Sequence, residues 1–257
     1  MRAFPVILLT SLIAVGSPNA ASAQTPTLPY DHVHLAAPDQ AKAVEWYQKM
    51  FGGQTTPEGK DRLMFGKTRF IWLKSDTAKP SDGTSVDHIG FSVPNAYLKM
   101  QELAAAGVKI KEPLRVSGAM SFGFVEDPWG VKIEILQDPD HLGFHHVHLV
   151  SRDAAATLNW YQARFGGTRG KLTGQVDGLK YGDVWLVVRQ VLKAPDATAG
   201  HAIDHIGWRV TDLDKTLADL TGIKVLQGRT DLQLATGMVH YSFVEDTGGT
   251  KIELVQR

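Results

Sequence analysis

The sequence contains no cysteine, which excludes disulfides, zinc–thiolate sites, iron–sulfur clusters and a cysteine nucleophile. Any bound metal must therefore be held by His, Asp or Glu. The chain also lacks an excess of charge, because 27 Lys and Arg balance 27 Asp and Glu in 257 residues. This balance argues against a nucleic-acid partner and favours a small-molecule one. The 43% hydrophobic and 21% charged residues are typical of a globular protein of one or two domains.

The N-terminus lacks an apolar run long enough to cross a bilayer, although it begins with a targeting pattern. Arg2 supplies a positive charge, and residues 4–15 are mostly apolar, about 12 residues where a spanning helix needs roughly 20. Ala21 and Ala23 match the small residues of a signal-peptidase site. We therefore expect residues 1–23 to be a signal peptide and the mature protein to be periplasmic or secreted. Without cysteine there is no lipoprotein anchor, so no membrane partner is expected after cleavage.

The rest of the chain is an internal repeat. Residues 32–53 match residues 146–167 at 12 of 22 positions. The heptapeptide DHIGFSV at 87 recurs as DHIGWRV at 204, and FVEDPWGVKIEILQ at 124 recurs as FVEDTGGTKIELVQ at 243. Matches spread over the whole length indicate two copies of one architecture.

Each copy is divided again into two parts with the same order of elements. A strand pattern at 32–36 precedes a helical pattern at 38–51, and strands are expected around 63–65 and 70–73. The same order recurs from residue 87 onward. The pattern therefore predicts two βαβββ modules in the first copy.

The second copy follows the same scheme, with helices expected near 153–165 and 212–221. The sequence thus predicts an α+β protein of four βαβββ modules, paired into two domains that each enclose a cleft. The domains are expected at 30–137 and 146–257, joined by a linker at 138–145. The linker histidines His141 and His145 show no ligand spacing.

Strand alternation selects the residues that line each cleft. Val33 and Leu35 are apolar and belong under the helix, so the neighbouring histidines face the other way. The residues expected to face away from the helices are His32, His88 and Glu134 in the first domain, and His146, His205 and Glu253 in the second.

Two imidazoles and one carboxylate can share a divalent cation. Burying an unpartnered carboxylate in a sheet is costly, so a cation or a hydrogen-bonded neighbour is expected beside it. The ligand set suits Fe, Mn, Ni, Co or Zn and leaves coordination positions open. The alternative is that the glutamates are surface residues and the histidines are only hydrogen-bonded.

These motifs resemble the vicinal oxygen chelate (VOC) superfamily of glyoxalases, bleomycin-resistance proteins, fosfomycin-resistance enzymes and extradiol dioxygenases. The resemblance rests on DHVHL with WYQKMFGG, on DHIGFSV, on EDPWGVKIEIL and on their counterparts in the second copy. It implies paired βαβββ modules with a metal in the cleft. By motif position it also implies the six metal ligands named above.

Departures from the family narrow the chemistry. The last strand of the first module in each domain, TRFIWLKS and DVWLVVRQ, lacks the glutamate that glyoxalase-type sites use as a fourth ligand. Extradiol dioxygenases carry a tyrosine ten residues before the metal glutamate, where this chain has Phe124 and Phe243. Tyr241 shares the parity of Phe243 and is a possible substitute. A lactoylglutathione lyase and a standard ring-cleaving dioxygenase are therefore both disfavoured.

Further cleft residues are expected to contact the substrate. His34 and His148 share the face of the ligand histidines, where they either face the substrate, support the ligands from behind, or are simply polar residues of the lining. Phe124, Phe243 and Tyr241 line the cleft beside them. Arg209 replaces Ser92 of the first domain and favours an anionic substrate in the second.

The sequence therefore favours an exported enzyme that uses two divalent metal ions, one per domain, on a small oxygen-bearing substrate. The reaction would be of the lyase, isomerase or dioxygenase type, with the metal as Lewis acid. The alternative is a binding or sequestering protein of the bleomycin-resistance type, without catalysis. The substrate, the metal and the oligomeric state are not specified by these patterns.

Overall fold

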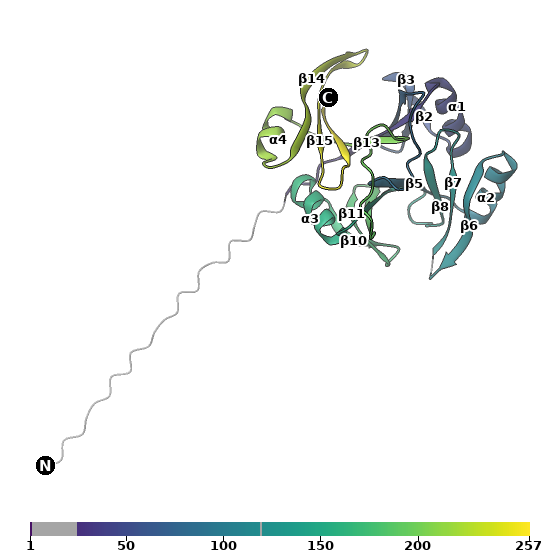
Figure 1. Cartoon of the computed structure of the whole chain (residues 1–257), viewed down its shortest axis with the longest axis horizontal. Coiled ribbons are helices and arrows are strands. Elements are labelled where there is room, and N and C mark those ends of the chain that lie inside the picture. The colour runs from purple at the N-terminus through teal and green to yellow at the C-terminus, as the bar shows by residue number, and fades with distance from the viewer. Residues whose placement is uncertain (2–24, 119) are drawn as a thin grey trace.

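The computed structural model describes residue 1, residues 25–118 and residues 120–257 (Figure 1). The expected signal peptide, apart from its first residue, lies outside the described residues. No helix in the described part of the chain is long and apolar enough to cross a membrane.

The described residues form four successive βαβββ modules, which confirms the predicted α+β fold. The first module contains β1 (Tyr30–Ala37), α1 (Gln40–Phe51), β2 (Gln54–Thr56), β3 (Gly59–Phe65) and β4 (Thr68–Lys74), and the second contains β5 (Val86–Ser92), α2 (Ala96–Ala105), β6 (Lys109–Ser117), β7 (Met120–Glu126) and β8 (Lys132–Leu136). The third contains β9 (Gly143–Ser151), α3 (Ala154–Phe165), β10 (Thr168–Leu172), β11 (Val176–Tyr181) and β12 (Val184–Gln190), and the fourth contains β13 (Ile203–Arg209), α4 (Leu213–Asp219), β14 (Lys224–Leu234), β15 (Gly237–Glu245) and β16 (Lys251–Gln256). Strand β9 begins within the expected linker.

Each helix begins at a short polar residue that caps it. The side chains of Asp39, Asn95, Asp153 and Asp212 each accept a hydrogen bond from the backbone N–H three residues later. Helix α1 ends at Gly52, whose φ of 77° is accessible to glycine at little cost. The capping residue therefore sets where each of these four helices begins after the first strand of its module.

The strands form two eight-stranded sheets, each built from one module of each half of the chain. Sheet I, in the order β14-β15-β16-β13-β1-β4-β3-β2, contains the first and fourth modules. Sheet II, in the order β10-β11-β12-β9-β5-β8-β7-β6, contains the second and third. The prediction that the two modules of each half share one sheet and enclose one cleft was wrong. The antiparallel pairs β1–β13 and β5–β9 join modules from different halves of the chain instead.

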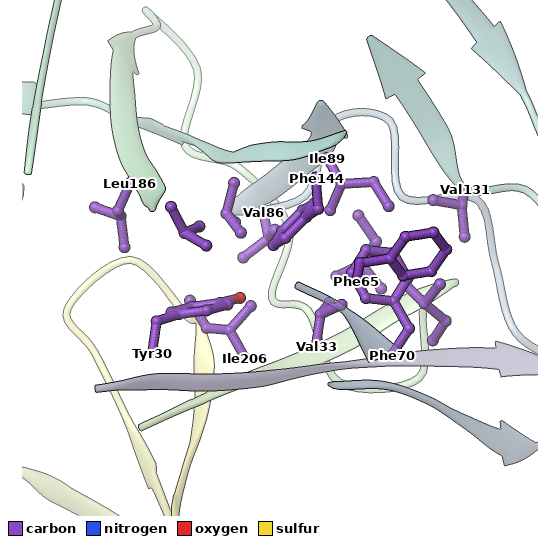
Figure 2. Packing of buried hydrophobic residues seen from close by; sticks show 14 of the residues in the cluster. Tyr30, Val33, Phe65, Phe70, Val86, Ile89, Val131, Phe144, Leu186 and Ile206 are labelled. Atoms are coloured by element: carbon purple, nitrogen blue, oxygen red, sulfur yellow. The ribbon is translucent and has the colours of Figure 1, made fainter. Parts of the chain in front are cut away.

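The hydrophobic core lies between the two sheets. Tyr30, Val33 and Ile206 of sheet I face Val86, Ile89 and Phe144 of sheet II, and all six are buried (Figure 2). Burying one large apolar side chain contributes roughly 1.5–3 kcal/mol, so this interface fixes which face of each strand points inward. Because Val33 points into the core, its neighbours His32 and His34 lie on the opposite face of sheet I.

Candidate metal centres

Two clusters of histidine and glutamate lie on the sheet faces that point away from the core. Site I consists of His32, His34, His205 and Glu253, and site II consists of His88, Glu134, His146 and His148. In each site the four residues offer ligand atoms that all lie within 4.8 Å of one another. All six ligands expected from the sequence are therefore in a cluster, together with His34 and His148.

The grouping of these residues differs from the sequence prediction. His32 was expected beside His88 and Glu134, but it lies with His205 and Glu253. His88 and Glu134 lie instead with His146. The reason is the pairing of modules, since each site takes ligands from the two modules that share its sheet.

Strand register explains the geometry of both sites. In site I, His34 is directly opposite His205, and Gly207 is opposite both His32 and Glu253. In site II the same positions recur. His148 is opposite His88, and Gly90 is opposite both His146 and Glu134. Each site is thus one row of histidine, glycine and glutamate, with a pair of histidines beside it.

The central glycine allows the histidine ring to cross the middle strand. A Cβ atom at Gly207 would lie 2.1 Å from Cε1 of His32, and one at Gly90 would lie 2.1 Å from Cε1 of His146. Such distances are far inside van der Waals contact. The glycines of the two DHIG motifs are therefore required for these rings to reach the glutamates.

The ligand atoms converge on one carboxylate oxygen in each site. Oε2 of Glu253 lies 3.0 Å from Nε2 of His205, 3.3 Å from Nε2 of His32 and 3.7 Å from Nε2 of His34. Oε2 of Glu134 lies 3.0 Å from Nε2 of His88 and 3.3 Å from Nε2 of His146. The side chain of Glu253 is 10% exposed and that of His34 is 13% exposed, so solvent reaches site I only narrowly.

Three of the ligand histidines are held by the aspartate that precedes them. Nδ1 of His32 contacts Asp31 at 2.9 Å. Nδ1 of His88 contacts Asp87 at 2.6 Å, and Nδ1 of His205 contacts Asp204 at 2.6 Å. This bond fixes the ring orientation and leaves Nε2 directed at the cluster, as is usual for histidines that bind metals.

Two lysines reinforce this arrangement in equivalent positions. Lys132 lies 3.0 Å from Asp87, and Lys251 lies 2.9 Å from Asp204. Because both lysines keep the aspartates paired, the β5 and β13 ligands of the two sites have the same surroundings.

The fourth histidine, His146, has no aspartate before it. Its Nδ1 lies 3.0 Å from Nδ1 of His145, whose Nε2 lies 3.2 Å from Asp138. Burial, and then the neighbouring His146, lower the pKa of His145 to about 4, so this ring is neutral at physiological pH. His145 was expected in the linker without ligand spacing, but it lies near the start of β9 beside a candidate ligand.

The charges of the histidines differ between the sites. Burial opposes protonation of His32, but nearby carboxylates, first Glu253, outweigh it and raise its pKa to about 9. Burial instead lowers the pKa of His146. It also lowers the pKa values of His34 and His148 well below their usual range. These three histidines are thus neutral imidazoles, the form that binds metals.

The donor atoms fit a divalent cation. Among the described residues, buried ring nitrogens of His32, His34, His146 and His148 have no hydrogen-bond partner. Leaving one such atom unpaired costs about 1–3 kcal/mol. The clusters also hold Glu134 and Glu253 ionised, because the adjacent histidines outweigh burial and keep both pKa values well below their usual range. One cation per site would satisfy the nitrogens and the carboxylate together.

The two phenylalanines predicted to line the clefts lie beside the clusters. Phe124 pairs with Glu134 across the strands, and its ring centroid is 5.1 Å from that of His88. Phe243 pairs with Glu253 and lies 5.0 Å from His205. Their rings extend each row of site residues with an apolar surface.

Tyr241 and Arg209 are further from the clusters. The ring of Tyr241 is 5.5 Å from that of Phe243, so it contacts the site's apolar edge and not the ligands. Arg209 donates from Nε to Asp31 at 3.1 Å and keeps its side chain 42% exposed. Arg209 therefore supports the aspartate behind His32 while part of its guanidinium remains accessible.

Comparisons with known proteins agree with this architecture. The model of the Glyoxalase/Bleomycin resistance protein/Dioxygenase superfamily matches residues 30–135 and 143–254. Glyoxalase I from Zea mays has a similar structure, with a TM-score of 0.71 at 18% identity, over 90% of this chain and 92% of that chain. A putative dioxygenase from Bacillus subtilis subsp. subtilis str. 168 gives a TM-score of 0.60 at 16% identity, over 90% of this chain and 85% of that one.

No curated protein matches the sequence significantly. At the identities found, the structural likeness shows the fold alone. The family model, however, covers most of the chain in two consecutive segments. The chain belongs to the Glyoxalase/Bleomycin resistance protein/Dioxygenase superfamily.

Proposed function

We propose that the protein is an exported enzyme of this superfamily that holds one divalent metal ion in each site and acts on a small oxygen-bearing substrate. The observation that carries the proposal is the convergence, twice, of three histidines and one glutamate within 4.8 Å on a buried sheet face. A structural role alone would not require eight polar side chains with several unpaired nitrogens.

His32, His205 and Glu253 would hold the metal in site I, and His146, His88 and Glu134 would hold it in site II. His34 and His148 stand where a fourth ligand can reach the same point. The corresponding β4 and β12 residues beside them, Ile71 and Val187, are apolar, so no carboxylate competes for that position. The metal, when bound, supplies Lewis-acid activation of a substrate oxygen.

The protein side chains restrict what can react there. Phe124 and Phe243 offer no hydroxyl to donate a proton, so neither ring can assist a substrate oxygen as a tyrosine would. The narrow exposure of Glu253 and His34 limits access to small molecules. These features support a lyase, an isomerase or a dioxygenase-type reaction on a compact oxygen-bearing substrate.

A second candidate is a binding protein of the bleomycin-resistance type. A cavity of about 900 Å³ lies between residues 27–30, the β3–β4 and β11–β12 turns, and residues 140–144. None of the eight site residues lines it. A sequestering protein would use this cavity and would not need the clusters.

Metal analysis separates the two candidates. The purified chain, incubated with Fe, Mn, Ni, Co or Zn and then desalted, is expected to retain two equivalents of at least one metal. Glu134→Ala and Glu253→Ala should each retain one, and the double variant none. Glu102→Ala, on the exposed face of α2, is the matched control. Metal content near zero in the wild type would overturn the enzyme proposal.

The reaction type is tested on the metal-loaded protein. Catechols, 2-oxoaldehyde adducts and epoxides represent the substrate classes of the superfamily. Turnover of one class that disappears in the Glu134→Ala, Glu253→Ala double variant would identify the chemistry. Turnover that persists without metal would contradict the proposed role of the two sites.

A further inference from the structure

The two sites differ most sharply behind one ligand. In site I the ring of His32 donates to Asp31, whereas in site II the equivalent ring of His146 faces His145. The β5 and β13 ligands do not differ in this way, because His88 and His205 both donate to an aspartate that a lysine pairs. The β1 and β9 ligands are therefore where the two sites can diverge.

The hydrogen bonds of site II assign the proton positions. Nε2 of His146 is directed at Glu134, so a metal-binding His146 carries its proton on Nδ1. That proton is donated to Nδ1 of His145, which must then carry its own proton on Nε2. Nε2 of His145 in turn donates to Asp138 at 3.2 Å. A neutral imidazole therefore stands between the ligand and the nearest carboxylate.

In site I the negative charge is in direct contact with the ligand. Asp31 is fully buried and accepts hydrogen bonds from His32 and from three arginines. Arg69, Arg209 and Arg257 lie 3.2, 3.1 and 2.8 Å from its oxygens. The arginines keep Asp31 ionised and oriented. Among the described residues no arginine contacts His145, whose polar partners are His146 and Asp138.

We propose that His145 makes site II the weaker of two unequal metal centres, while Asp31 makes site I the tighter one. The inference rests on the proposed function, since it concerns metals in both sites. A carboxylate that accepts from a ligand imidazole strengthens that ligand, and losing such a partner typically costs 10–100-fold in metal affinity. A neutral imidazole acceptor provides less of this effect. His145 is thus a positioning residue that sets the strength of His146.

Single-site chains allow each affinity to be measured. Glu253→Ala leaves only site II, and Glu134→Ala leaves only site I. Zinc dissociation constants are measured by competition with a chromogenic chelator, after circular dichroism has shown that each variant is folded. Zinc binding at site I displaces the proton that His32 carries at neutral pH, so the dissociation constants are measured over a range of pH and corrected for that proton. After this correction the site I chain is expected to bind zinc at least about 10-fold more tightly than the site II chain.

An isosteric pair isolates the charge behind His146. In the site II chain, Asp138→Asn is combined with either His145→Asp or His145→Asn, so that the new carboxylate does not face Asp138. The His145→Asp variant should bind zinc at least about 10-fold more tightly than the His145→Asn variant. Both new side chains accept a hydrogen bond from His146, but only the aspartate is charged. Conversely, Asp31→Asn should weaken zinc binding by the site I chain.

The outcomes distinguish this inference from the proposed function. Equal affinities of the His145→Asp and His145→Asn variants, or a site II chain that binds more tightly than the site I chain, would overturn the role of His145 while leaving a two-metal protein. Failure of both single-site chains to bind zinc or any of the other four metals would overturn the proposed function and this inference with it.

Discussion

Pairs of substitutions should give opposite results under two groupings of the ligands into sites. One is the grouping in the structure, and the other is the grouping expected from the sequence. In the structure Glu134 and His146 share site II, whereas His32 belongs to site I. Starting from Glu134→Ala, adding His146→Ala should therefore change nothing further. Adding His32→Ala should remove the remaining metal. The expected content is two ions in the wild type, one in Glu134→Ala, one with His146→Ala added and none with His32→Ala added.

Thermal stability gives an independent measure of the same pairing. At a free metal concentration about 1,000 times the dissociation constant, one occupied site stabilises the folded chain by about 4 kcal/mol. For a chain of this size about 1 kcal/mol corresponds to roughly 2–4 °C, so each site should raise Tm by roughly 8–16 °C. Metal should therefore still raise Tm in the Glu134→Ala, His146→Ala variant, and should have no effect in the Glu134→Ala, His32→Ala variant.

The assay is metal analysis of desalted protein together with Tm measured with and without metal. Comparing the metal-induced shift within each variant removes the cost of losing a buried side chain from the result. If the variant lacking Glu134 and His32 kept one metal, and the variant lacking Glu134 and His146 kept none, the pairing of modules across the two sheets would be wrong.

Three further results are expected. Gly207→Ala should remove metal from site I, since its Cβ would lie 2.1 Å from His32, whereas Gly228→Ala, with nothing within 4 Å, should not; equal metal contents would contradict this. Burial raises the pKa of Asp127 to about 6 from 3.8, so the native state binds this proton more tightly and loses about 3 kcal/mol of stability as pH rises from about 4 to 6. The difference in free energy of unfolding between wild type and Asp127→Asn should show that change, and parallel curves would refute it. Mass spectrometry of exported protein should find an N-terminus near Gln24, and an exclusively cytosolic, full-length chain would disprove export.

Strand parity was sufficient to choose the polar face of each strand. The alternation in DHVHL and KIEIL places histidine and glutamate opposite the apolar residues, and the structure puts those apolar residues in the core. The helical spacing of apolar residues likewise located the helices to within a few residues. These features are local, so a few neighbouring residues determine them.

The partners of each strand were not predictable in the same way. Strand β1 pairs with β13, about 170 residues further along the chain, and nothing in either segment excludes pairing within its own half. The role of Gly207 depends on that register, because only there does the ring of His32 lie above it. His145 and His146 are adjacent in the sequence, but the role of His145 becomes clear only by comparison with the aspartates that precede the other three ligand histidines.

The exchange of modules makes the two halves of the chain depend on each other. The first half supplies His32 and His34 to site I but not the glutamate, and it supplies His88 and Glu134 to site II but only one of the three histidines. Neither half alone therefore contains a complete cluster. Each site combines one strand, β1 or β9, with a module that carries the glutamate and the same Asp–His–Lys arrangement. The ligand histidine of that strand contacts Asp31 in site I and His145 in site II. Because Asp31 and His145 belong to different strands and different sites, one can change without disturbing the other. The duplicated chain can thus carry two clusters of one geometry whose proposed metal affinities differ.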